Sequence, residues 1–283
     1  MDKRLNILIS YAYWNKKLGS YLKQIDEEYP NLIRLFIDSG AFTAFTKNKK
    51  ITIDEYCEFI DGLPIKPWRY ITLDVIGNEQ ATKDNYLKLL SMGLKPVPVF
   101  THGSDWKDID FYYDTSDFIC YGGLVGQKGS SQVINDINTF MLHAKNRKSH
   151  LLGYTSLKWL KRFRPYSCDS SSWLVAQRYG RIGIYLGNGK LATISKKDLV
   201  ENPTNEVKKM LRSLDLDIDK LKYKDNKIGW HGGDSYSQHT TTISWIEMAF
   251  DMESNIGTKL FLAIGDVSQL RRIHNGYNHL KNL

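Results

Sequence analysis

An apolar, strand-like run followed by a loop and a helix recurs along most of this 283-residue chain. Eight runs have the length and apolar content of strands, at residues 6–12, 32–37, 70–74, 96–100, 118–121, 150–153, 164–168 and 259–264. Helical patterns accompany them at 16–28, from about 52, and at 81–92, 132–144, 156–163, 241–252 and 267–280. Strands alternating with helices in this way are typical of a (β/α)8 barrel. We therefore expect an α/β fold of the TIM-barrel type, with residues 1–283 as a single domain.

The main alternative is an open, doubly wound sheet. That fold would carry a Gly-x-Gly-x-x-Gly motif after its first strand, and the sequence has none there. The strand and helix pattern is interrupted only after the seventh strand, where residues 181–194 predict a hairpin around Gly187-Asn188-Gly189. A charged segment and a glycine-rich loop follow. We expect residues 181–240 to form an insertion between strands seven and eight, placed where it could clamp a substrate.

Three acids, Asp38, Asp74 and Asp169, stand at the ends of predicted strands. In a barrel the active site lies at the carboxyl ends of the strands, so the three would face one mouth. Paired carboxylates suit glycosidic chemistry, in which one acts as nucleophile and another as general acid and base. Capping of the following helix is the simpler explanation for Asp38 or Asp169 taken alone. Three acids beside glycine or serine favour a site.

Other candidates lie at the same predicted mouth. The Gly122–Gly126 loop would let backbone groups approach a ligand, although glycines also serve ordinary turns. His102 could donate to a ligand or be a structural histidine. His231 and His239 lack a cysteine or acidic pair at metal-binding spacing, so no metal is expected. Cys168 precedes Asp169 and would point to the other face of its strand.

The formal net charge of +8 and the pI near 9.1 favour a polyanionic partner, although many basic proteins bind no nucleic acid. Residues 141–165 hold seven basic residues and no acid. Candidate phosphate contacts are Lys47, Lys49, Lys50, Lys158, Lys161, Arg162 and Arg164. Each of them could equally be a solvated charge on an exposed face.

Cysteine usage and hydropathy bear on the compartment. Three widely spaced cysteines, Cys57, Cys120 and Cys168, form neither a disulfide framework nor a zinc motif. No apolar run approaches the ~20 residues of a membrane span, and the first apolar run is too short for a signal peptide. We expect a cytoplasmic protein that does not enter a membrane.

Five segments resemble, in order, motifs of the tRNA-guanine transglycosylases. They are Ile37-Asp38-Ser39-Gly40-Ala41-Phe42, similar to Asp-Ser-Gly-Gly-Phe; Leu73-Asp74, similar to the second base-binding aspartate; Gly122-Gly123-Leu124-Val125-Gly126, similar to Gly-Gly-Leu-Ala-Val-Gly; His150-Leu151-Leu152-Gly153, similar to His-Tyr-Leu-Met-Gly; and Asp169, at the nucleophile's place. The match covers residues 32–173, half of the chain.

The departures from that family point to one branch of it. The Cys-x-Cys-x-x-Cys cluster of the zinc subdomain is missing from the sequence. The segments 167–173 and 98–103 look more like the shorter, phage-type branch, which exchanges guanine for a 7-deazaguanine in DNA. The resemblance therefore implies DNA and a free 7-deazaguanine base as substrates, with tRNA as the less favoured alternative. For a phage-encoded chain the compartment would be the host cytoplasm.

The resemblance also implies roles for individual residues. Asp169 would be the nucleophile, Asp38 the general acid and base, and Asp74 a ligand of the base edge. Further substrate contacts would come from Ser39, Gly40, Phe42, His102, Gly122, Gly123, Leu124, Gln127 and Gly153. Gln127 stands where enzymes that take an aminomethyl base have a glutamate, so a base without an ammonium, such as the 7-cyano compound, is expected. No cofactor is implied, and a monomer is the default.

Two other classes of protein remain open at this point. A glycosidase or DNA glycosylase would use paired acids and release a free product with water as acceptor. A non-catalytic nucleic-acid binder on a barrel scaffold would use the basic surface and carry out no reaction.

Overall fold

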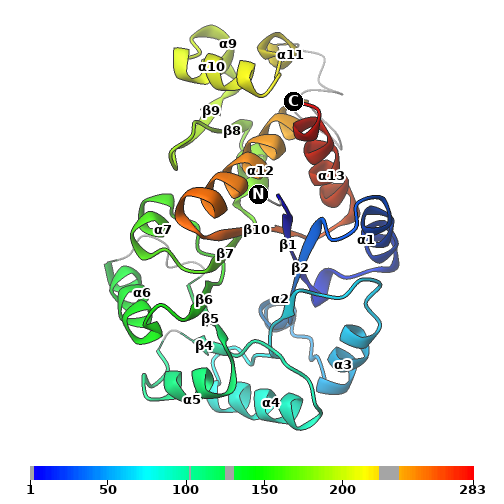
Figure 1. Cartoon of the computed structure of the whole chain (residues 1–283), viewed down its shortest axis with the longest axis vertical. Helices are drawn as coiled ribbons and strands as arrows, with labels where there is room; N and C mark the ends of the chain where they lie inside the picture. The colour runs from blue at the N-terminus through cyan, green and yellow to red at the C-terminus, as the bar shows by residue number, and fades with distance from the viewer. Residues whose placement is uncertain (1–2, 102, 125–130, 223–235) are drawn as a thin grey trace. The chain divides into compact units, whose positions relative to one another are not determined.

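The structure is a computed structural model of the whole chain, and it describes residues 3–101, 103–124, 131–222 and 236–283 (Figure 1). The chain divides into two compact units. The first consists of residues 1–170 and 257–265, and the second of residues 171–256 and 266–283. The segment expected as an insertion, 181–240, falls within the second unit, which is wider than that segment.

The first unit is built on a curled sheet of eight strands (Figure 1). The order is β3-β2-β1-β10-β7-β6-β5-β4, and every pairing is parallel. The strands are β1 (Leu5–Ser10), β2 (Ile33–Asp38), β3 (Arg69–Tyr70), β4 (Val99–Thr101), β5 (Phe118–Gly122), β6 (Lys148–Leu151), β7 (Ser167–Ser170) and β10 (Lys259–Ile264). The predicted α/β class and the eight parallel strands are confirmed.

One contact lies outside these ladders. Ile71 forms an isolated parallel bridge with Val97, next to the two end strands β3 and β4. The Thr72 N–H donates to the Val97 carbonyl at 2.9 Å, and the Val97 N–H donates to the Tyr70 carbonyl at 2.8 Å. Backbone groups beside the two end strands of the sheet therefore satisfy one another.

Alternation along the strands builds the core of the first unit. Because neighbouring side chains in a strand point to opposite faces, one set fills the concave side of the curled sheet. This buried cluster consists of Leu8, Phe36, Ile71, Val97, Val99, Phe118, Cys120 and Phe261. Residues of the opposite register, such as Ile7, Ile9 and Ile37, are buried as well. The strands are thus apolar on both sides, as strands of parallel sheets are.

Helices follow the strands on the outside of the sheet (Figure 1). They are α1 (Lys16–Glu28), α2 (Ala41–Thr46), α3 (Ile53–Asp61), α4 (Glu79–Ser91), α5 (Asp108–Thr115), α6 (Ser131–Ala144) and α7 (Leu157–Phe163). A 3-10 turn, η1 (Tyr11–Tyr13), ends the first strand earlier than expected. The helix starts have local causes. Asn15 caps α1, Thr52 and Glu55 form a capping box on α3, and Asn78 caps α4.

Two strands are shorter than the sequence predicts. The run expected at 96–100 forms β4 only from Val99, because Pro96 and Pro98 have no N–H to give to a ladder. The run expected at 70–74 pairs regularly only at Arg69 and Tyr70, after which the chain turns toward α4.

The second unit begins with η2 (Ser172–Leu174) and α8 (Val175–Arg178) and contains the predicted hairpin. The hairpin strands are β8 (Arg181–Tyr185) and β9 (Leu191–Ser195), antiparallel, with Arg181 opposite Ser195. The helices after it are α9 (Lys196–Glu201), α10 (Asn205–Ser213), α11 (Ile218–Lys222), α12 (Tyr236–Ile256) and α13 (Val267–Lys281). Side-chain oxygens of α12 satisfy the free edge of β8: Thr241 and Ser244 accept from the N–H groups of Gly183 and Tyr185. In the described part of the chain, no helix combines the length and apolar character needed to cross a membrane.

Candidate functional site

The three predicted acids stand at the same edge of the first unit's sheet. Asp38 is the last residue of β2, Asp169 is the third residue of β7, and Asp74 follows β3. In a parallel sheet the carboxyl ends of all strands lie on one side, so the fold brings the three together. None of them is the N-cap of the next helix. Those positions belong to Gly40, Asn78 and Ser171, so simple capping does not explain the acids.

Asp38 has the most perturbed carboxyl of the three. Burial, and after it the nearby charges of Asp74 and Asp169, raise its pKa to about 7 against the lowering effect of the Gly40 N–H. One of its oxygens, Oδ2, accepts the N–H of Gly40 at 3.0 Å. Charged and neutral forms of Asp38 are therefore both accessible near neutral pH, which is what a general acid and base requires.

The turn after Asp38 ties it to Asp74. Ser39 is fully buried, and its hydroxyl donates to Oδ1 of Asp74 at 2.5 Å while accepting the N–H of Ala41 at 3.3 Å. Burial also raises the pKa of Asp74. Gly40 has a φ of 79°, and a Cβ there would lie 2.8 Å from the backbone nitrogen of Ala12. Only glycine fits this tight turn.

Asp169 is held differently, by two donors on one oxygen. Its Oδ1 accepts the N–H of Gly153 at 2.7 Å and lies 3.1 Å from Nε2 of His150. No hydrogen-bond partner for Oδ2 is found among the described residues, and the side chain keeps 11% of its surface exposed. The carboxylate is thus fixed in orientation with its second oxygen available. Such an arrangement suits a nucleophile.

His150 is a site residue to which the sequence reasoning gave no role. Its ring is fully buried and makes an edge contact with Phe36, with centroids 4.9 Å apart. A carboxylate only accepts hydrogen bonds, so Nε2 carries the proton toward Asp169. Nδ1 then accepts from the Ser167 hydroxyl at 2.8 Å. The signal in the sequence was its place as the first residue of the segment that resembles His-Tyr-Leu-Met-Gly.

The surroundings of the Cys120 thiol agree with the convergence of the acids. It lies fully buried in the concave core, and its pKa is raised far above the usual range, first by burial and then by the charges of Asp169, Asp38 and Asp74. The pKa of the thiol at this one interior position is therefore affected by the charges of all three carboxylates. Cys168 is also buried, with a raised pKa, as expected for a packing residue.

The glycine loop lies at the same edge, after β5. Gly122 ends the strand, Gly123 has a φ of 77° and an exposed backbone, and Leu124 is buried. Gly153, with a φ of 63°, follows β6 and meets Asp169 as described. His102 and Gln127, also predicted to contact substrate, lie outside the described residues.

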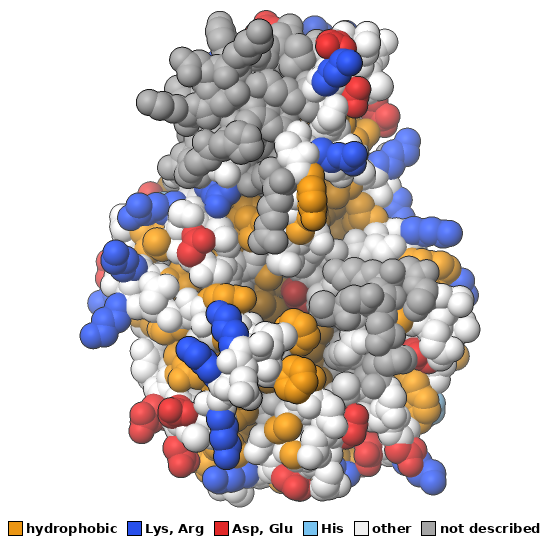
Figure 2. All heavy atoms as spheres, turned by 180° about the vertical axis from the view of Figure 1, so that it is seen from behind, with side chains coloured by type: hydrophobic (Ala, Val, Ile, Leu, Met, Phe, Trp, Pro, Cys, Tyr) orange, Lys and Arg blue, Asp and Glu red, His pale blue; other side chains and the backbone are white. Residues whose placement is uncertain are grey.

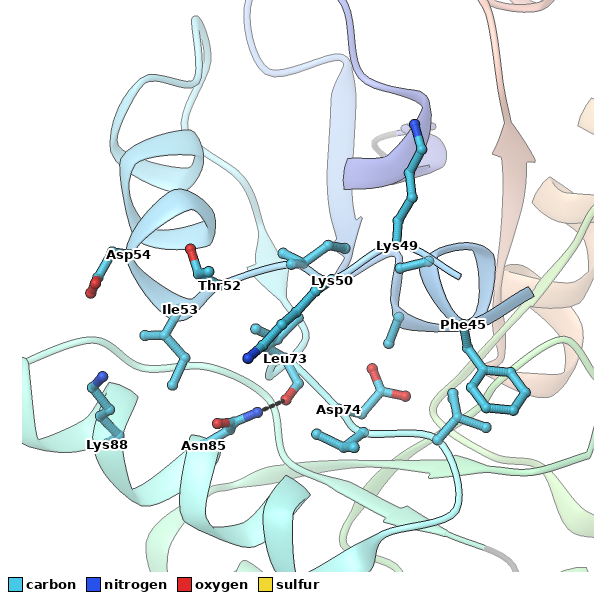
Figure 3. Close-up of a pocket in the computed structure, with 15 residues that line it drawn as sticks. Phe45, Lys49, Lys50, Thr52, Ile53, Asp54, Leu73, Asp74, Asn85 and Lys88 are labelled. Atoms are coloured by element: carbon cyan, nitrogen blue, oxygen red, sulfur yellow. Dashed lines mark hydrogen bonds between the residues drawn. The ribbon is translucent and has the colours of Figure 1, made fainter. Parts of the chain in front are cut away.

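The aromatic and basic candidates lie on two segments. Phe42 on α2 is 56% exposed, next to the Asp38 turn. Lys49 and Lys50 line a cavity of about 520 Å³ whose wall includes Asp74 (Figure 3), and Lys47 lies over the Tyr13 ring at 5.6 Å. The other four, Lys158, Lys161, Arg162 and Arg164, are exposed on or just after α7. Their exposure fits phosphate binding and solvation equally.

Within the described ranges, no three His, Cys, Asp or Glu side chains are grouped so that they could hold a metal ion. No protein-family model matches the chain, and no curated protein is significantly similar to it. Any assignment of function therefore depends on the motifs and on the geometry given above.

Proposed function

We propose that the protein is a base-exchange transglycosylase, a pentosyl-transferring enzyme that replaces guanine in DNA with a 7-deazaguanine derivative. The observation that carries this proposal is the contrast between two neighbouring acids. Asp169 is oriented through one oxygen by Gly153 and His150, whereas burial and like charge bring the pKa of Asp38 to about 7. A fixed nucleophile beside a titratable acid is the pair that double displacement at a sugar carbon needs.

The fold that goes with this proposal is a closed (β/α)8 barrel. The bridge between Ile71 and Val97 supports it, because it joins the segments beside the two end strands, β3 and β4. Closure would leave no free sheet edge. It would also place the Asp38, Asp74 and Asp169 side chains around one mouth, as in other barrels of this kind.

In the first half of the reaction, Asp169 attacks C1′ of the guanine nucleotide through Oδ2. A bond forms between Oδ2 and C1′, and the glycosidic bond between C1′ and N9 breaks with its electron pair going to the base. Asp38, protonated at this stage, gives its proton to the departing guanine. The products are neutral guanine, an ionised Asp38 and a covalent sugar ester on Asp169.

In the second half, the incoming 7-deazaguanine takes the place of guanine. Its N9 attacks C1′, the ester bond to Asp169 breaks, and the N9 proton passes to Asp38. Both acids return to their starting states, so the exchange needs neither a redox cofactor nor a metal. Water must be kept from C1′ while the ester exists, because hydrolysis would leave an abasic site.

Base recognition follows from the rest of the site. Asp74 would accept from the N–H groups of the base edge, and the backbone of Gly123 and Leu124 would bind its carbonyl. The exposed Phe42 ring offers a face on which a base taken out of the stack can lie. A glutamine at position 127, where enzymes that take an aminomethyl base have a glutamate, supports the 7-cyano compound as incoming base. Preference for the aminomethyl base in a competition assay would contradict that choice.

DNA is favoured over tRNA by the resemblance at residues 167–173 and 98–103 and by the missing zinc cluster. The decisive experiment uses a labelled 7-deazaguanine with DNA and tRNA offered together. Label in DNA is the expected result, and label in tRNA alone would reassign the substrate. A denaturation-resistant adduct with DNA, absent in Asp169→Ala and Asp169→Asn, is expected as well. Release of free guanine with no adduct and no incorporation of label would indicate a glycosylase that uses water.

A further inference from the structure

A cavity beside Asp74 is left unused by this mechanism. It has a volume of about 520 Å³ and lies between α2, the start of α3 and the segment after β3 (Figure 3). Asp74 lies in its wall, but Asp38 and Asp169 do not line it. We call it the α2–α3 cavity. It is adjacent to the place where the target base would bind, yet separate from the reacting atoms.

One side of the α2–α3 cavity is apolar. Phe45 from α2 is 63% exposed, Val75 is 37% exposed and Ile76 is 36% exposed. Exposed apolar side chains are common on proteins, and Figure 2 shows other hydrophobic side chains (orange) near Lys and Arg (blue) on the surface. Exposure alone therefore decides nothing. What sets these three apart is that they line one cavity together with Asp74.

The other side of the cavity is basic. Lys50 reaches into it from the loop between α2 and α3, whereas the Lys49 side chain on the same loop points away from Asp74 (Figure 3); both are exposed. Neither of them forms an ion pair within the part of the chain that the structure describes. The cavity is also lined by Lys88 from α4 and by the carboxylates of Asp54 and Asp74. An apolar wall with an aromatic ring, together with a lysine that forms no ion pair among the described residues, complements a ligand that has a flat base and a phosphate.

We propose that the α2–α3 cavity binds the nucleotide next to the target guanine, with its base against Phe45, Val75 and Ile76 and its phosphate on Lys50. This inference rests on the proposed function, since it takes the target base to bind at Asp74. It also predicts whether the DNA substrate is paired or single-stranded. A base in a duplex has both faces stacked and its edge paired, so the neighbour must be unstacked as well. The enzyme therefore acts on single-stranded DNA or on a locally opened strand.

The test measures binding of a guanine-containing single-stranded oligonucleotide and of the matched duplex by fluorescence anisotropy. Phe45→Ala is expected to weaken single-strand binding about 5- to 150-fold, the range for one lost base–aromatic contact. Phe45→Tyr, which keeps a ring, should restore it. The control is Leu142→Ala on α6, which removes a side chain of similar exposure, 68%, far from the cavity in sequence. Thermal melting of each variant shows whether it is folded.

The salt dependence of binding distinguishes the contribution of the apolar wall from that of the basic wall. Phe45→Ala should leave the slope of log K against log salt unchanged, because it removes no charge. The variant Lys50→Gln should lower that slope by about 0.7, the value for one phosphate contact on a single strand. The matched control is Lys16→Gln on α1, which makes the same charge change elsewhere.

The outcomes distinguish this inference from the proposed function. If Phe45→Ala binds like the Leu142→Ala control, the α2–α3 cavity does not hold a neighbouring base. The covalent adduct on Asp169 would still form, and the proposed function would stand. If no adduct forms with any nucleic acid while binding of the single strand depends on Phe45, the cavity remains a nucleic-acid site and the proposed chemistry fails.

Discussion

The Nε2 atom of His150 lies 3.1 Å from Oδ1 of Asp169, across the adjacent strands β6 and β7. The Ser167 hydroxyl, 2.8 Å from Nδ1, fixes the other side of the ring. Ser167 is the residue paired with His150 in the sheet register, so the backbone ladder itself sets this arrangement. A histidine that donates to one oxygen of the nucleophile, and whose other ring nitrogen is hydrogen-bonded to Ser167, is a positioning residue for that nucleophile.

His150→Phe should therefore slow formation of the Asp169 adduct about 10- to 150-fold, the range for a lost hydrogen bond to a charged group. The phenyl ring fills the space without donating. Because His150 does not touch the base, the KM for the free 7-deazaguanine should stay unchanged while kcat falls. His150→Gln, which can still donate, should recover part of the rate. An adduct rate equal to wild type in a folded His150→Phe protein would show that the contact is only structural.

The pH dependence of adduct formation should follow Asp38. In the proposed first half, Asp38 gives up a proton, and its pKa is about 7. Single-turnover rates should be level below this pH and fall as pH rises through it. Asp74→Asn removes one of the charges that raise the pKa of Asp38, so the fall should move to lower pH. A rate that rises through pH 7 would mean that Asp38 acts first as a base.

The same carboxyl makes the stability of the fold depend on pH. Folded protein keeps the Asp38 proton up to about pH 7, whereas an unfolded chain releases it near its ordinary pKa of about 4. Between these values the folded state binds more protons, so the free energy of unfolding falls as pH rises. Asp38→Asn removes this effect. Its stability relative to wild type should grow from pH 4 to pH 7, with an upper limit of roughly 4 kcal/mol.

Urea denaturation of both proteins at several pH values measures that difference. The control is Asp114→Asn, at an exposed acid after the middle of α5. It should track wild type at every pH. A difference in stability between Asp38→Asn and wild type that does not change with pH would mean that burial does not raise the pKa of the Asp38 carboxyl.

Much of the first unit could be predicted because its pattern is local. Each strand is marked in the sequence by a short apolar run, and eight of these runs form the parallel sheet. The acids could be placed for the same reason, since a residue at the end of a parallel strand lies at a known edge of the sheet. The short helices α2, with six residues, and α5, with eight, were missed, because about two turns carry little periodicity.

Contacts between strands were harder to foresee. The His150–Asp169 contact depends on the register between β6 and β7, and no local pattern fixes which residues face each other across two strands. The boundaries between the two compact units could not be predicted for a similar reason. Strand β10 belongs to the first unit, while α12 and α13 on either side of it belong to the second, and composition does not change at either boundary.

The turn that joins Asp38 to Asp74 offers the sharpest test of how the backbone supports the site. Gly40 and Gly93 both have a left-handed φ, 79° and 78°. A Cβ at Gly93 would meet nothing within 4 Å, whereas one at Gly40 would lie 2.8 Å from the nitrogen of Ala12. Gly93→Ala should therefore cost only the backbone strain, about 1–2 kcal/mol, with normal adduct formation. Gly40→Ala should cost more and also displace Ser39, whose hydroxyl holds Asp74. Urea denaturation and the adduct assay measure the two effects separately. Equal destabilisation of the two variants, with unchanged adduct yield in both, would show that the turn can shift without disturbing the acids.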